Sequence, residues 1–120
     1  MTSPLLIVED EPAIQMLLED IFEDAGFALR VVGNGAQAIA ILDDDALELT
    51  GLITDIRLGP GLTGWDIARE ARERRPNLPV IYITGFSEES WTARGVQNSV
   101  LVPKPFTPAS ILSALRGLLA

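Results

Sequence analysis

The 120-residue chain contains no cysteine and no histidine. These absences exclude disulfide bonds and thiolate chemistry, and they exclude an imidazole base or imidazole metal ligand. No apolar run approaches the roughly 20 residues that a membrane-spanning helix needs. We therefore expect a cytoplasmic chain with no signal peptide and no membrane insertion. Any catalysis must depend on carboxylates, hydroxyl groups, lysine or a hard cation.

Basic residues are also scarce, because 9 Lys and Arg stand against 17 Asp and Glu, for a formal net charge of −8. Binding to nucleic acid through a broad basic surface is therefore disfavoured, and a protein or small-molecule partner is expected. The length and the hydrophobic content of 48% suit one core. We expect a single domain over residues 1–120, with no tether to an output domain visible after the final helix.

Short apolar runs alternate with segments of helical periodicity along the whole chain. The predicted strands cover Leu5 to Val8, Phe27 to Val32, Leu52 to Asp55, Val80 to Ile83 and Val100 to Val102. The predicted helices cover Ile14 to Ala25, Ala36 to Leu42, the region of Ile67 to Ala71, Ser87 to Arg94, and Ile111 to Leu119. Alternation of this kind favours an α/β fold, a three-layer (βα)5 doubly wound parallel sheet. Trp91 is the only large apolar residue of the fourth helix, so we expect that helix to be weakly attached.

Residues capable of chemistry follow four of the five predicted strands. They are Glu9 and Asp10, Asp55, Thr84 and Lys104, whereas only Gly33-Asn34-Gly35 follows the second strand. Ligands of open α/β sheets bind at the carboxyl ends of the strands. If the second strand lies at the edge, the order is 2-1-3-4-5 and all four equipped strands become neighbours.

Carboxylates at the ends of adjacent strands, about 4.8 Å apart, repel one another unless a cation lies between them. A cluster of oxygen donors suits Mg²⁺ or Mn²⁺. Asp55 is then a candidate nucleophile, because an aspartate can form an acyl phosphate. Lys104 offers a positive charge to a phosphate oxygen, and Thr84 offers a hydroxyl donor.

Four motifs, Glu9-Asp10, Leu52 to Asp55, Thr84-Gly85 and Lys104-Pro105-Phe106, occur in an order and spacing that resemble the receiver domains of response regulators. The resemblance covers essentially the whole chain. It implies that Asp10 and Asp55, with the main-chain carbonyl of Arg57, coordinate Mg²⁺, and that Glu9 acts directly or through water.

The same resemblance implies a function in a two-component phosphorelay. Asp55 is expected to accept a phosphoryl group from a histidine kinase or a histidine phosphotransfer protein, Lys104 to contact it, and Thr84 to move toward it. The chain is then a signalling switch that changes only its own Asp55 rather than an enzyme. A downstream protein is expected to bind the face from the fourth helix to the fifth strand, and the Lys104-Pro105 peptide is expected to be cis.

Three features depart from the family pattern. Leu101 stands three positions before Lys104, where receivers usually carry an aromatic switch residue. The run Tyr82 to Phe86 resembles instead a subgroup with a Thr-Gly-aromatic fourth strand, in which Phe86 or a shift of the fourth helix serves this role. The loop with Gly59-Pro60-Gly61 holds an extra residue, and Pro103 removes a backbone donor beside Lys104.

Simpler interpretations exist for each candidate. Asp10 and Asp55 are also suited to capping a helix and a loop, Thr84 to a strand, and Lys104 to a solvated surface. Trp65 is predicted to pack in the core, and Trp91 either to pack or to contact a partner.

Other functions remain as alternatives. One is a receiver without phosphoryl turnover that acts as a protein-binding scaffold, and another is a metal-dependent phosphohydrolase. The second is weakened because Arg57 stands two residues after Asp55, where such an enzyme would carry another acid. A flavin protein is disfavoured because Glu9 to Glu11 would repel the phosphate.

Overall fold

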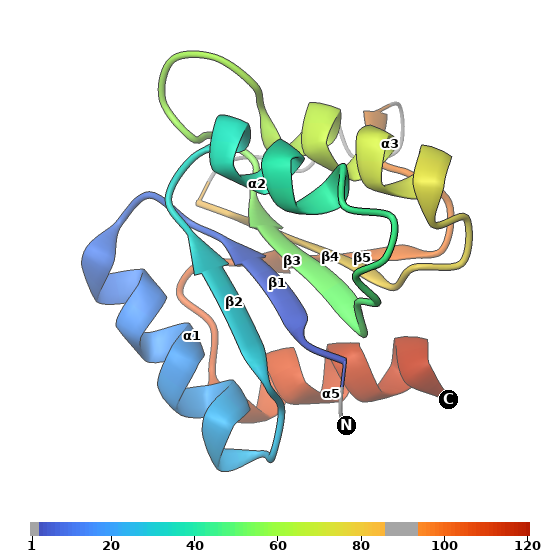
Figure 1. The fold of residues 1–120 in the computed structure, drawn as a ribbon. Helices are drawn as coiled ribbons and strands as arrows, with labels where there is room; N and C mark the ends of the chain where they lie inside the picture. Colours follow the sequence, from blue (N-terminus) through green and yellow to red (C-terminus); the bar gives the residue numbers. More distant parts are fainter. Residues whose placement is uncertain (1–2, 86–93) are drawn as a thin grey trace.

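The structure, a computed structural model, describes residues 3–85 and 94–120. Within them, parallel strands form one five-stranded sheet with helices on both faces (Figure 1). The strands are β1 (Leu5–Val8), β2 (Leu29–Val32), β3 (Gly51–Asp55), β4 (Val80–Thr84) and β5 (Ser99–Pro103). Their order is β2-β1-β3-β4-β5, which confirms the order predicted from the strand ends.

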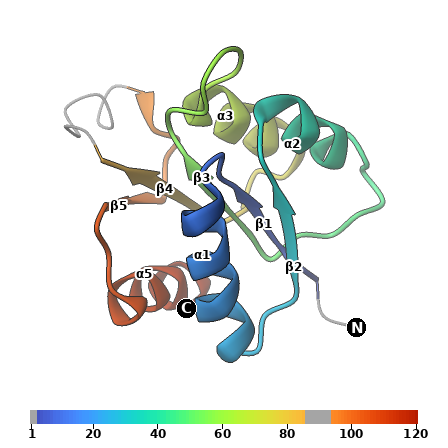
Figure 2. The same cartoon turned by 90° about the vertical axis from the view of Figure 1, so that its left-hand side faces the viewer.

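Helices cover the two faces of the sheet in pairs (Figure 2). α1 (Pro12–Asp24) and α5 (Pro108–Leu119) lie on one face, and α2 (Gly35–Leu42) and α3 (Gly64–Arg74) lie on the other. The predicted three-layer α/β fold is therefore confirmed. Of the helix predicted over Ser87 to Arg94, all but the last residue lies outside the described residues. None of the helices in the described part of the chain is long and apolar enough to cross a membrane.

Strand β1 shows why the sheet needs cover on both faces. All of its side chains are buried, and alternate residues point to opposite faces. Leu6 and Val8 belong to the core under α2 and α3, whereas Leu5 and Ile7 belong to the core under α1 and α5. A continuous apolar run is thus the expected sequence of a central parallel strand.

Strand β2 begins at Leu29 rather than at the predicted Phe27. The backbone N–H of Phe27 donates to the carbonyl of Phe22 at 3.0 Å, and the two rings pack edge to face with centroids 6.0 Å apart. Phe27 therefore closes the end of α1 instead of extending the sheet. Gly26, at φ +94°, makes the turn between them.

Local capping starts three of the described helices. The Asn34 side chain accepts from the N–H of Gln37 at the start of α2. Capping boxes pair Thr63 with Asp66 at α3, and Thr107 with Ser110 at α5. These bonds satisfy backbone donors that the first turn of a helix leaves without partners.

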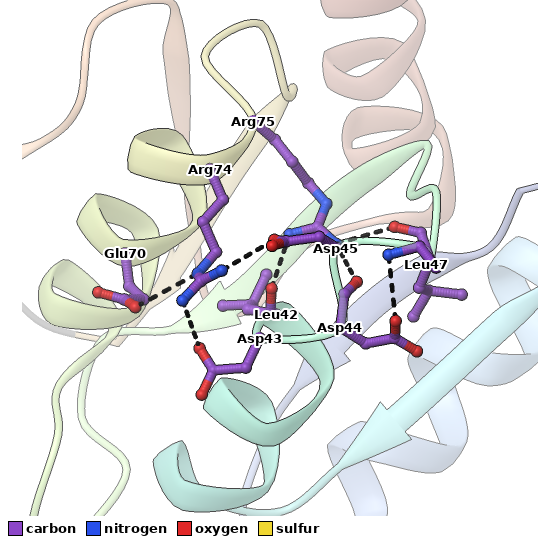
Figure 3. A network of polar contacts seen from close by, with 9 residues as sticks. Leu42, Asp43, Asp44, Asp45, Leu47, Glu70, Arg74 and Arg75 are labelled. Atoms are coloured by element: carbon purple, nitrogen blue, oxygen red, sulfur yellow. Dashed lines mark hydrogen bonds and ion pairs between the residues drawn. The ribbon is translucent and has the colours of Figure 1, made fainter.

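The connection from α2 to β3 is held by Arg75, which follows α3 (Figure 3). Its guanidinium donates to the carbonyl oxygens of Leu42, Asp44 and Leu47 at 3.0, 3.0 and 2.8 Å. One side chain therefore satisfies three backbone acceptors in a segment without ladder partners.

We expect Arg75→Ala to lower the free energy of unfolding by about 2–3 kcal/mol, because these carbonyls lose a charged donor. Its neighbour Arg74 is a matched control, since it forms only exposed ion pairs with Asp43, Asp45 and Glu70 (Figure 3). Arg74→Ala should change stability little. Urea denaturation of both variants measures the difference, and equal losses would contradict a specific role for Arg75.

Candidate functional site at the carboxyl edge of the sheet

The predicted site residues meet at the carboxyl edge of the sheet. Val8 of β1 pairs with Thr54 of β3, so Glu9 and Asp55 occupy the next positions along their strands. Asp55 is opposite Ile83, and Thr84 is opposite Pro103, which precedes Lys104. The strand register thus brings acidic, hydroxyl and basic side chains to one rim of the sheet.

Four carboxylates form a cluster at this rim. One ligand atom from each of Glu9, Asp10, Glu11 and Asp55 lies within 4.8 Å of the others. Glu9 and Asp55 are buried, whereas Asp10 and Glu11 are exposed. Glu11 was not among the predicted ligands, although the unbroken acidic run from Glu9 to Glu11 is the sequence signal that points to it.

Lys104 places a positive charge against this cluster. Its Nζ lies 3.0 Å from Oδ2 of Asp55, 3.1 Å from Oε1 of Glu9 and 3.6 Å from Oε1 of Glu11. The side chain is 17% exposed, so the simpler interpretation of a solvated surface lysine is wrong. Burial alone would lower the pKa of Lys104, but the hydrogen bonds and charges of Asp55 and Glu9 outweigh it and raise the pKa. The ammonium group is therefore held in its charged form.

Glu9 is the most deeply buried acid of the cluster, with no exposed surface. Its Oε2 accepts from the N–H of Glu11 at 3.0 Å, and its main-chain carbonyl accepts from Nε2 of Gln15 at 2.6 Å. Its Oε1 faces Nζ of Lys104 at 3.1 Å and has no further partner among the residues that the structure describes.

Burial raises the pKa of Glu9 to about 7. The hydrogen bond from Glu11 and the charge of Lys104 lower this pKa, and the neighbouring charge of Asp55 raises it further. A carboxyl group in such a position lacks compensation for its charge. A further cation beside Oε1 would supply it.

These residues fit a hard divalent cation. All the donor atoms are oxygen, which suits Mg²⁺ or Mn²⁺ better than a soft metal. The cluster carries more negative charge than one ammonium group offsets, and the buried Oε1 of Glu9 has an unused acceptor position. The predicted carbonyl ligand at Arg57 stays a prediction.

Asp55 ends the central strand β3 in a confined position. Its Oδ1 accepts from the N–H of Arg57 at 3.3 Å, so the loop-capping interpretation also holds without competing with the bond from Lys104 to Oδ2. Gly64, the first residue of α3, lies so close that a Cβ there would overlap the carbonyl oxygen of Asp55. Only glycine lets α3 begin directly against the end of β3.

The loop between β3 and α3 turns at two glycines, and the extra residue expected in it stays a prediction. Gly59 and Gly61, on either side of Pro60, have φ of +79° and +103°. Both values lie in the left-handed region that glycine tolerates best. The two glycines therefore allow the loop to turn back toward Thr63, where α3 is capped.

Thr84 ends β4 and is 3% exposed. Its carbonyl oxygen accepts from the N–H of Lys104 at 2.7 Å, so the backbones of the two predicted phosphate contacts are directly linked. The peptide between Lys104 and Pro105 is cis, in agreement with the expectation.

Asp10 does not cap the first helix. α1 begins with Pro12, its N-cap residue is Glu11, and no side chain makes the capping bond. The capping interpretation of Asp10 is therefore wrong. Proline at the first helical position has no N–H and therefore needs no hydrogen-bond acceptor there. The Asp10 carboxylate belongs to the acidic cluster instead.

Comparisons with known proteins agree with this geometry. A family model for the response regulator receiver domain matches residues 5–116. The response regulator SaeR of Staphylococcus aureus is 30% identical over 117 residues, covering 96% of this chain and 50% of the relative. The chain therefore spans about half the length of the curated relatives it matches.

Solved structures are similar over nearly the whole chain. A response regulator receiver protein of Sinorhizobium medicae has 37% identity and a TM-score of 0.94, covering 98% of this chain and 94% of that one. The receiver domain of the Pseudomonas aeruginosa sensor histidine kinase PA1611 has 25% identity and a TM-score of 0.83, covering 99% and 98%. That structure holds a magnesium ion in its active-site cleft.

The buried acid predicts how stability depends on pH when no divalent cation is present. The pKa of Glu9 rises from 4.5 to about 7 on folding, so its favourable contribution is complete below pH 4.5 and is lost as the pH rises toward 7. Each pKa unit corresponds to about 1.4 kcal/mol, so we expect a loss of a few kcal/mol. Urea denaturation in EDTA across this range measures it.

Glu9→Gln is the control, because it retains the shape of the side chain without an ionisable group. The difference in unfolding free energy between wild type and Glu9→Gln should change across this pH range and be flat on either side of it. A difference that stays constant with pH would assign the effect to other groups.

The acidic cluster predicts a divalent cation site that needs Asp10. Removing a carboxylate beside a divalent cation costs at least about 1.4 kcal/mol, so Asp10→Ala should weaken Mg²⁺ binding about tenfold or more. Isothermal titration calorimetry measures the affinity. Asp24→Ala, at the far end of α1, removes the same charge away from the site and should change affinity little. Equal losses in both variants would indicate nonspecific attraction to an acidic protein.

Proposed function

The chain belongs to the response regulator receiver domain family, and from that premise we propose that it is a phosphorylation-dependent signalling switch with Asp55 as its phosphoacceptor. One observation carries the proposal. The Asp55 carboxylate lies between an acidic cluster and the ammonium group of Lys104 at the end of the central strand. Asp55 therefore contacts both the candidate cation site and Lys104, whose positive charge can bind the phosphoryl oxygens.

We propose that Asp10 and Asp55, with Glu9 and the carbonyl of Arg57, would hold Mg²⁺ or Mn²⁺. When bound, the ion would offset the charge of the carboxylates and of the phosphoryl oxygens. The acidic cluster and the unused acceptor position of Glu9 support this assignment.

The proposed reaction needs little from the protein besides positioning and charge. An oxygen of Asp55 forms a bond to phosphorus while the bond from phosphorus to the donor's imidazole nitrogen breaks. The electron pair of that bond returns to the imidazole, which takes a proton from solvent. Lys104, already 3.0 Å from Oδ2 of Asp55, exchanges this ion pair for one with a phosphoryl oxygen.

The switch would follow from the added charge. A phosphoryl group on Asp55 brings new acceptor oxygens, and Thr84 ends the adjacent strand, where its hydroxyl can move to donate to one of them. The N–H of Lys104 donates to the Thr84 carbonyl, so a displacement of the end of β4 would also displace the end of β5. In this proposal the chain changes only its own Asp55 and has no separate substrate.

The proposed phosphoryl donor is a histidine kinase or a histidine phosphotransfer protein. The proposed output is contact with another protein through the face from the fourth helix to β5. Of this face, β5 is described, while the helix is outside the described residues apart from Arg94.

Incubation with acetyl phosphate tests the chemistry directly. We expect the intact mass to rise by one phosphoryl group when Mg²⁺ is present and not when EDTA replaces it. Asp55→Asn should abolish the gain, because it retains the shape of the side chain but not the nucleophile. Intact-mass spectrometry detects the adduct.

A missing adduct has two explanations that beryllofluoride separates. Beryllofluoride with Mg²⁺ mimics the phosphoryl group, so binding without an adduct would indicate fast hydrolysis. Failure of both the adduct and beryllofluoride binding would contradict the proposed function and favour the alternative of a protein-binding scaffold.

A further inference from the structure

Tyr82, the only tyrosine in the chain, links β4 to the segment that precedes β5. Its side chain is fully buried, and its hydroxyl accepts a hydrogen bond from the N–H of Val96 at 3.0 Å. β5 begins only at Ser99, so the Val96 amide lies outside the sheet ladder. The chain leaves β4 at Thr84, and this hydroxyl ties it back to the same strand at Val96.

An aromatic pair supports this contact. The rings of Trp65 and Tyr82 have centroids 4.7 Å apart and are tilted by 52°, and the guanidinium carbon of Arg94 lies 5.7 Å from the Trp65 ring centroid. Trp65 directly follows Gly64, the residue that abuts the carbonyl of Asp55. The segment before β5 therefore contacts two rings, Trp65 of α3 and Tyr82 of β4.

Arg72 of α3 holds the same segment from another side. Its guanidinium donates to the carbonyls of Leu78, Gln97 and Asn98 at 2.7, 2.5 and 3.1 Å. Those bonds anchor the segment to α3 and to the turn before β4. The Tyr82 hydroxyl connects the same segment to β4, the strand that ends in Thr84.

The position of Tyr82 on β4 places its side chain on the same face of the sheet as that of Thr84. Side chains two residues apart on a strand share a face, so Tyr82 and Thr84 point to the same side of β4. In the β4–β5 register, Tyr82 is opposite Leu101, which is half-buried against the same core. Of these two register partners, the one on β4 carries the aromatic ring and the hydroxyl, and the one on β5 is aliphatic.

We propose that Tyr82 is a positioning residue for the phosphoacceptor site. Its hydroxyl holds the segment before β5 against β4 at Val96, on the face of β4 that also carries the Thr84 side chain, and so restricts the end of β4 before any ligand binds. A strand end that is already restricted loses less conformational freedom when Thr84 engages a phosphoryl group. This inference rests on the proposed function of Asp55.

Tyr82→Phe tests the proposal, because it removes the hydroxyl and keeps the ring. Beryllofluoride with Mg²⁺ is the probe. We expect its affinity to fall about threefold to tenfold, the range that one hydrogen bond supports. The affinity for Mg²⁺ alone should stay within about twofold, because its proposed ligands lie on β1 and β3 and in the loops that follow them. The amide resonance of Val96 in ¹⁵N spectra should shift, reporting loss of the bond.

Thr50→Val is a matched control for the loss of a hydroxyl group. The Thr50 hydroxyl donates to the carbonyl of Ser3 at 2.6 Å, at the opposite edge of the sheet. This variant should lower stability while leaving beryllofluoride affinity unchanged. A purely structural role for Tyr82 would give the same pattern, so the two affinities together distinguish positioning from stability.

Several outcomes would overturn the proposal. Tyr82→Phe with unchanged or tighter beryllofluoride binding would do so, and so would an unchanged Val96 resonance. If wild type itself binds no beryllofluoride in the presence of Mg²⁺, the proposed function fails first. Failure of the positioning role alone is recognised by normal binding in wild type and in Tyr82→Phe.

Discussion

The accumulation of negative charge around one ammonium group is the interaction on which the site depends. Lys104 lies within 3.6 Å of carboxylate oxygens from Asp55, Glu9 and Glu11. One positive charge does not balance these carboxylates, and burial, with the charge of Asp55 as a smaller cause, raises the pKa of Glu9 to about 7. A divalent cation and a phosphoryl group arriving together would nearly offset each other's charge, so the same cluster suits both the metal-bound and the phosphorylated states.

The fold and most of the site could be predicted from the sequence because both follow from strand ends. The apolar run Leu5–Val8 predicts a buried strand, and a register of parallel strands then brings Glu9, Asp55 and Lys104 to one edge. Phe27 was assigned to the wrong element, because periodicity cannot distinguish a strand residue from an apolar residue that closes a helix. That distinction depends on the contact with Phe22.

Other parts of the site depend on contacts between distant segments, which a local pattern does not contain. Glu11 is the N-cap residue of α1, but its carboxylate makes no capping bond and lies in the cluster instead. The sequence pattern places Tyr82 on a strand beside Thr84 but contains no signal for the partner of its hydroxyl. Its bond to Val96 crosses 14 residues of sequence, and only the three-dimensional arrangement shows that the hydroxyl meets that amide.

Leu101 stands on β5 where the family pattern has an aromatic residue, yet a polar ring is present beside it, on β4. Tyr82 and Leu101 are register partners, so the ring of Tyr82 packs beside the aliphatic side chain. A buried hydroxyl needs a partner, and the Val96 amide needs an acceptor because it lies before the β5 ladder. Each group satisfies the other, and the bond lies two residues from Thr84 along β4. The polar ring therefore lies on β4, the strand of Thr84, and its bond links the segment before β5 to that strand.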